Sequence, residues 1–75
     1  MKKLDLHGVP HEEVPDLVHQ FINENWKPDL ELAIVTGHSS RMRSLVYDVL
    51  KQYDLELVTS DLRNGGQIRV QTWHE

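Results

Sequence analysis

Leu4-Asp5-Leu6-His7-Gly8, near the start of the chain, alternates apolar and ionisable residues and then reaches a glycine. Successive side chains of a β-strand point to opposite faces, so this pattern places Leu4 and Leu6 on one face and Asp5 and His7 on the other. A carboxylate and an imidazole at one strand end, beside a glycine that permits close approach of a ligand, form a candidate acid/base pair. An edge strand with a solvated polar face has the same pattern, and both interpretations stay open at this point.

The first half of the chain beyond this run predicts a helix and a second strand. Apolar residues at the i, i+3, i+4, i+7 spacing indicate an amphipathic helix over residues 11–25, with Pro15 in its first turn. Residues 30–36 follow as a strand that is largely apolar on both sides, so we expect it to be more central than the first.

The second half predicts another helix and a β-hairpin. Ser39 or Ser40 is expected to cap a helix that runs to residue 52 or 53. Residues 55–60 and 67–72 then alternate as two strands around the turn signal Arg63-Asn64-Gly65-Gly66.

The order β-α-β-α-β-β predicts a two-layer α/β sandwich formed by a single domain over residues 1–75. The first, third and fourth strands each have one polar side, so both helices are expected on the same face of the sheet. The other face is expected to carry Asp5, His7, Glu31, Glu56 and Arg69. Right-handed crossovers make the first three strands parallel, and the hairpin makes the fourth antiparallel.

Composition narrows the function classes. The chain has 75 residues, no cysteine and a formal net charge of −4. The missing cysteine excludes thiolate chemistry, and the net charge argues against coating of nucleic acid by bulk positive charge. No apolar stretch approaches the roughly 20 residues that span a bilayer. We therefore expect a cytoplasmic monomer without membrane contact. The five histidines lack metal-ligand spacing, so no metal site or cofactor is expected, while a divalent ion stays open.

The carboxyl ends of the predicted parallel strands form one edge, where ligands bind in open α/β sheets. Free N–H groups, hydroxyls and arginines at the start of the second helix would suit a phosphate. A plain capped turn with solvated arginines is the alternative interpretation of this segment. The candidate phosphate-binding residues are Gly8, Thr36, Gly37, His38, Ser39, Ser40, Arg41, Arg63, Gly65 and Gly66.

Three features, in order along nearly the whole chain, resemble the small MutS-related (Smr) domain family: the run of residues 4–8, Thr36-Gly37 before His38-Ser39, and Gly65-Gly66 before the last strand. The resemblance implies the sheet order 1-2-4-3 and a fold similar to the C-terminal domain of translation initiation factor 3. Members of the family bind or cut DNA or RNA, some as endonucleases. The resemblance places Asp5 and His7 in the catalytic or substrate-contacting role and Thr36 and Gly37 in a phosphate-facing loop.

Two departures from the family pattern keep more than one function open. The family loop has a second glycine, whereas here Gly37 is followed directly by His38, and Gly65-Gly66 continues as Gln67 without further small residues. As an endonuclease, the domain would use His7 to move a proton and Asp5 to orient that imidazole or stabilise its charged form. The alternative is a non-catalytic module, inactivated by the shortened loop, that binds nucleic acid or a protein. A third interpretation is an interaction protein that uses the open sheet face or an edge strand.

Overall fold

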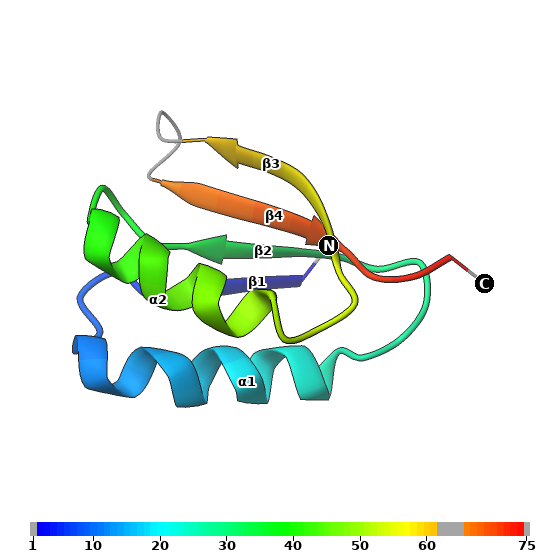
Figure 1. Ribbon diagram of the computed structural model, residues 1–75, viewed down its shortest axis with the longest axis horizontal. Coiled ribbons are helices and arrows are strands. Elements are labelled where there is room, and N and C mark those ends of the chain that lie inside the picture. Colours follow the sequence, from blue (N-terminus) through cyan, green and yellow to red (C-terminus); the bar gives the residue numbers. More distant parts are fainter. Residues whose placement is uncertain (1, 62–65, 75) are drawn as a thin grey trace.

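The computed structural model describes residues 2–61 and 66–74, which form a four-stranded sheet with helices packed on one face (Figure 1). The elements in chain order are β1 (Lys2–Asp5), the 3-10 helix η1 (His11–Glu13), α1 (Val14–Glu24), β2 (Glu31–Val35), α2 (Ser40–Leu50), β3 (Glu56–Asp61) and β4 (Gln67–Gln71). Within the described residues, neither α-helix has the length and hydropathy needed to cross a membrane.

The sheet has the order β1-β2-β4-β3, which confirms the expected topology. β1 pairs with β2 in parallel, and β4 lies antiparallel to both β2 and β3. β2 is an inner strand, as its apolar composition predicted, and β1 and β3 are the two outer strands. A register shift between Leu57 and Thr59 interrupts the pairing of β3 with β4.

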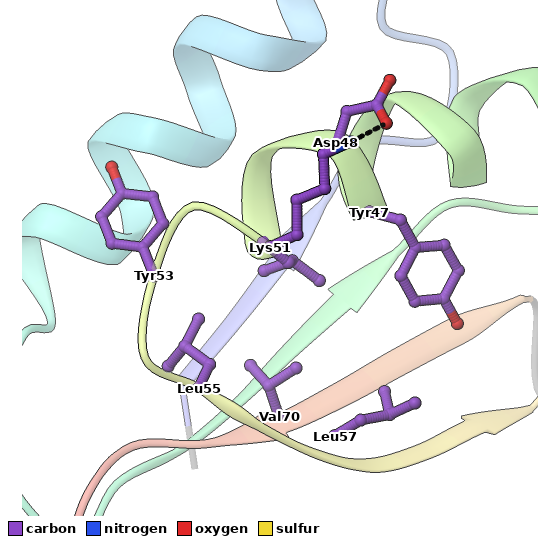
Figure 2. Close-up of a pocket in the computed structure, with 8 residues that line it drawn as sticks. Tyr47, Asp48, Lys51, Tyr53, Leu55, Leu57 and Val70 are labelled. Carbon is purple, nitrogen blue, oxygen red and sulfur yellow. Dashed lines mark ion pairs between the residues drawn. The ribbon is translucent and has the colours of Figure 1, made fainter.

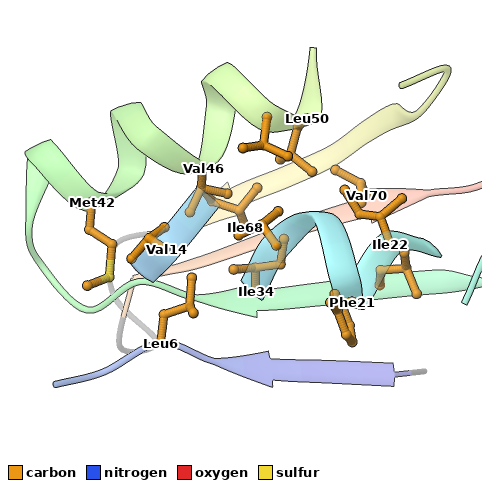
Figure 3. Close-up of a cluster of buried hydrophobic side chains, with 13 residues drawn as sticks. Leu6, Val14, Phe21, Ile22, Ile34, Met42, Val46, Leu50, Ile68 and Val70 are labelled. Atoms are coloured by element: carbon orange, nitrogen blue, oxygen red, sulfur yellow. The ribbon is translucent and has the colours of Figure 1, made fainter. Parts of the chain in front are cut away.

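The core lies between the sheet and the helices. The register places Leu32 opposite Val70 and Ile34 opposite Ile68, so these side chains share one face of the sheet. Both helices contribute buried residues to the same cluster, including Val18 and Ile22 from α1 and Val46 and Leu50 from α2 (Figure 3). Both helices therefore cover one face, as the alternating strands predicted.

The opposite face of the sheet is polar. Arg69 and Glu31 form an ion pair there, with Arg69 Nη2 2.6 Å from Glu31 Oε2. Asp5 and Glu56 are exposed. Among residues 2–61 and 66–74, helices cover one face of the sheet and leave the other without them, which confirms the two-layer sandwich.

Several element boundaries differ from the sequence-based expectation, and α2 ends at Leu50 rather than at residue 52 or 53. β1 ends at Asp5, so Leu6 and His7 lie beyond the strand, and the Val9 N–H donates to the Leu6 carbonyl oxygen at 3.0 Å to close a turn. Leu6 is nevertheless fully buried, and burying a leucine contributes roughly 1.5–3 kcal/mol. The core thus holds the residue immediately before His7.

The first helix begins with a 3-10 turn at His11–Glu13 and becomes α-helical at Val14. Pro15 lies in the first turn of α1, as expected, where its missing N–H has no intrahelical partner to lose. The helix was therefore predicted in the right place, and only the geometry of its opening turn was missed.

Candidate functional site

The ends of β1 and β2 lie side by side, because these strands are parallel neighbours with Asp5 opposite Val35. The contact continues one residue further, where the Leu6 N–H donates to the Val35 carbonyl oxygen at 2.9 Å. His7 Cδ2 lies 3.8 Å from the position that a Cβ on Gly37 would occupy. The exposed His7 ring therefore lies over the bare side of Gly37, and the two segments border one surface.

Gly66, immediately before β4, brings a third segment to this surface. Its carbonyl oxygen accepts a hydrogen bond from the Thr36 N–H at 2.7 Å. Its φ is +70°, in the left-handed region, and a Cβ there would lie 2.5 Å from the carbonyl carbon of Gly37. Only glycine fits at this position, so Gly66 sets how closely β4 approaches the loop after β2.

Thr36 holds this loop from the inside. It is only 2% exposed, and its hydroxyl lies 2.7 Å from the carbonyl oxygen of Gly66 and 3.1 Å from that of Gly37. The sequence interpretation gave Thr36 a phosphate-facing role, and the structure engages its hydroxyl within the protein. Its contribution to the site is the position that it gives to the two glycines.

The start of α2 follows directly on this loop. Ser39 is the N-cap, with extended backbone at φ −77° and ψ 114°, and its Oγ accepts a hydrogen bond from the Met42 N–H at 3.1 Å. This confirms the predicted capping role. Ser40 and Arg41 are the first helical residues and are exposed, and backbone N–H groups at this position have no intrahelical acceptor. His38, between Gly37 and the cap, is exposed as well.

Asp5 acts on the backbone of His7. Its Oδ1 accepts a hydrogen bond from the His7 N–H at 2.9 Å, a contact between residues two apart that is typical of an Asx-turn. The carboxylate thereby fixes the turn that carries the imidazole. Gly8 follows in the same turn and is exposed.

Arg43 places a further cation at this end of the sheet. Its guanidinium Nη2 donates to Ser60 Oγ, near the carboxyl end of β3, and the same oxygen accepts from the Tyr47 hydroxyl at 2.7 Å. β3 runs in the same direction as β1 and β2, so Ser60 lies toward the edge that carries His7 and Gly37. The site end of the molecule thus carries both Arg41 and Arg43.

Two of the candidate residues, Arg63 and Gly65, lie outside the described residues. Among residues 2–61 and 66–74, no three His, Asp or Glu side chains gather as metal ligands. The remaining candidates run from the end of β1 to the start of α2 and include Gly66. They all lie at the end of the sheet where the parallel strands β1 and β2 finish.

Sequence patterns alone missed two features of the site. The packing of Gly66 on Gly37 joins residues 29 positions apart, and no local pattern reports such a contact. The inward hydroxyl of Thr36 depends on the same approach. The glycine pair before the last strand was the available signal, but it indicated a turn rather than a contact.

Comparison with known proteins identifies a family. Residues 4–67 match the family model of the Smr domain, so the match covers most of the chain. No curated protein and no solved structure matches it.

Proposed function

The chain belongs to the Smr domain family, a family of nucleic-acid-binding, nuclease-like domains, and from that premise we propose that it binds RNA at the His7–Gly37 edge and cleaves it there. The observation that carries this proposal is the position of the His7 ring, with Cδ2 3.8 Å from the side-chain position of Gly37. A proton-transfer group thus lies beside a loop that leads directly into a helix start. Phosphate groups bind readily at such helix starts.

In this proposal, the phosphate lies against Gly37 and the N–H groups of Ser40 and Arg41. The positive end of the helix dipole and the charge of Arg41 stabilise the negative charge that builds on the phosphoryl oxygens in the transition state. Thr36 and Gly66 support the loop from behind through the contacts described above. Gly8 and His38 border the phosphate at the surface.

His7 is the proposed acid/base. RNA suits this arrangement because its 2′-hydroxyl supplies the nucleophile next to the phosphorus. His7 takes the 2′-hydroxyl proton as the 2′-O–P bond forms, and the P–O5′ bond breaks to leave a cyclic phosphate. The proton then passes from His7 to the departing 5′-oxygen. Asp5 keeps the imidazole in place through its hydrogen bond to the His7 backbone.

The experiment compares cleavage of end-labelled single-stranded RNA by the wild type, His7→Ala and His74→Ala, with and without divalent metal. His74 is the matched control, because it is also an exposed histidine but lies near the opposite end of the sheet. There its Nδ1 lies 2.9 Å from Asp29 Oδ1. Positioned general acid–base groups contribute about 100-fold or more. We expect His7→Ala to lose at least that factor, with unchanged circular dichroism, and His74→Ala to retain full activity.

Two results separate the alternatives. Undiminished cleavage by His7→Ala would refute the catalytic assignment. RNA binding by the wild type without any product would instead support the non-catalytic module, which the direct passage from Gly37 to His38 favours because the loop has lost its second glycine. Wild-type products that end in a linear 3′-phosphate or a 3′-hydroxyl from the start would contradict attack by the 2′-hydroxyl.

A further inference from the structure

Arg43, Tyr47 and Ser60 form a hydrogen-bonded cluster between α2 and β3, which we call the Arg43 cluster. Arg43 Nη2 and the Tyr47 hydroxyl both donate to Ser60 Oγ, the hydroxyl at 2.7 Å. Arg43 and Tyr47 stand one turn apart in α2, so they share one face of the helix. Figure 2 shows Tyr47 directed from α2 toward the sheet. The proposed cleavage uses none of these three side chains.

The cluster lies at the same end of the sheet as the proposed phosphate site. Ser60 is opposite Ile68 near the carboxyl end of β3, so its side chain is on the helix-covered face. Helical side chains tilt toward the helix N-terminus, so Arg43, one turn into α2, leans back toward the Ser39 cap. Only β4 separates β2 from β3, which places the cluster roughly 10 Å across the sheet from the loop after β2.

The hydroxyl of Ser60 is arranged to donate toward the surface. A hydroxyl oxygen has one proton to donate and two lone pairs that accept. Ser60 Oγ already accepts from Arg43 and from Tyr47, so both of its acceptor positions are filled. Because Ser60 is exposed, an anion at the surface can accept the remaining proton.

Arg43 carries a positive charge that the described side chains do not neutralise. The ion pairs among those side chains involve Lys51, Arg69 and His74, and Arg43 is in none of them. Within the same part of the chain, its Nη1 is buried and has no hydrogen-bond partner. A guanidinium that has given up water without gaining a carboxylate is stabilised by an anion beside it.

Guanidinium and hydroxyl donors that converge in this way suit a phosphate group, and an RNA strand supplies phosphates in series. Phosphates of one strand are roughly 3.4 Å apart along the axis of a stacked helix and farther apart in an extended strand. A strand whose reacting phosphate lies at Gly37 therefore brings another phosphate to the Arg43 cluster within a few nucleotides.

We propose that the Arg43 cluster binds a second phosphate of the same RNA strand, a few nucleotides from the phosphate at Gly37. This inference rests on the function proposed above and names the kind of strand that the site prefers. Arg43 and Ser60 contact the second phosphate, and Tyr47 holds Ser60 from the helix side. The domain therefore selects strands of several nucleotides over a dinucleotide.

The test compares binding of a dinucleotide and a hexanucleotide of 2′-O-methyl RNA, whose blocked 2′-oxygen prevents cleavage. The dinucleotide has a single phosphodiester and cannot occupy both places at once. Titrations of the nitrogen-15-labelled chain, read at the Gly37 amide, give the Kd of each oligonucleotide at the phosphate site. We expect Arg43→Gln to weaken the hexanucleotide about tenfold and the dinucleotide by no more than about twofold.

Matched variants separate the cluster from general charge. Lys51→Gln removes an exposed cation just after α2, and we expect it to change either Kd by no more than about twofold. Ser60→Ala should weaken the hexanucleotide about threefold, whereas Ser44→Ala, at an exposed serine of α2, should leave it unchanged. Arg43→Lys should recover only part of the loss, because an ammonium keeps the charge without the planar fork.

Equal weakening of the two oligonucleotides by Arg43→Gln would overturn the proposal, because Arg43 would then act at the Gly37 phosphate or through the fold. Equal effects of Arg43→Gln and Lys51→Gln would overturn it as well, by indicating diffuse charge. Failure of the proposed cleavage is recognised separately. A wild type that shows the length dependence but does not cut unmethylated RNA keeps the second phosphate site and loses the nuclease assignment.

Discussion

A Cβ at Gly66 would lie 2.5 Å from the carbonyl carbon of Gly37, so the site depends on a missing side chain as much as on those present. The close approach brings the Gly66 carbonyl oxygen within reach of the Thr36 N–H and hydroxyl. The loop after β2 is thereby fixed where His7 lies against Gly37. At the scale of single residues, backbone contacts support the site from behind and polar side chains form its surface.

Gly66→Ala is expected to destabilise the chain more than Gly8→Ala. Both glycines have positive φ, +70° and +80°, but a Cβ on Gly8 meets nothing within 4 Å. The control therefore carries only the backbone strain, roughly 1–2 kcal/mol. Urea unfolding should show a larger loss for Gly66→Ala, together with weakened RNA binding. Equal losses in the two variants would mean that the contact with Gly37 is unimportant.

At the scale of elements, α2 contributes its first turn to the proposed phosphate site. It begins at the Ser39 cap beside that site. Its first turn lies at the site end because β1 and β2 are parallel, which places both strand ends and the following helix start at the same end of the sheet.

Ser39→Ala should lower the free energy of unfolding by about 1 kcal/mol, because the Met42 N–H loses its acceptor. Ser44→Ala is the matched control, since Ser44 is exposed within α2 and alanine has the higher helix propensity. We expect that variant to be neutral or slightly more stable. If Ser39→Ala proved as stable as Ser44→Ala in urea unfolding, the capping role would be wrong.

The elements could be predicted from the sequence because each rests on local signals. Alternation identified β1, β3 and β4, and a continuous apolar run identified β2. The 3.6-residue period identified the helices, and the serines marked the start of α2. The turn at His7 and the register shift in β3 were missed, because they depend on tertiary contacts and on pairing with β4. Site residues could be nominated by their place at strand ends, but the inward direction of the Thr36 hydroxyl could not.

At the scale of the whole molecule, the sheet has two different ends (Figure 1). One end carries His7, Gly37 and the start of α2. Near the other, Trp26 packs against Trp73 with ring centroids 4.8 Å apart, and the Asp29 N–H donates to the Trp73 carbonyl oxygen at 2.8 Å. These contacts hold the segment after β4 against the loop before β2. Residues at this second end serve as positions for control substitutions.

The negative net charge predicts a shallow salt dependence of RNA binding. The chain has a net charge of −4, so its cations contact few phosphates, and each contact with a single strand contributes about −0.7 to the slope of log K against log salt. Arg41→Ala should make this slope shallower by about 0.7, the contribution of one phosphate contact. Lys27→Ala, which removes an exposed cation after α1, should leave it unchanged. Fluorescence anisotropy over a salt series measures both, and equal effects would indicate diffuse binding.

The function proposed here requires nucleic acid to bind where His7, Gly37 and the start of α2 meet. Titration of the nitrogen-15-labelled chain with a short single-stranded RNA at low salt tests it directly, because each backbone amide reports its own surroundings. We expect the largest shifts at His7, Gly37, Ser40 and Arg41. Shifts concentrated instead at Trp26, Trp73 and their neighbours at the opposite end of the sheet would contradict it.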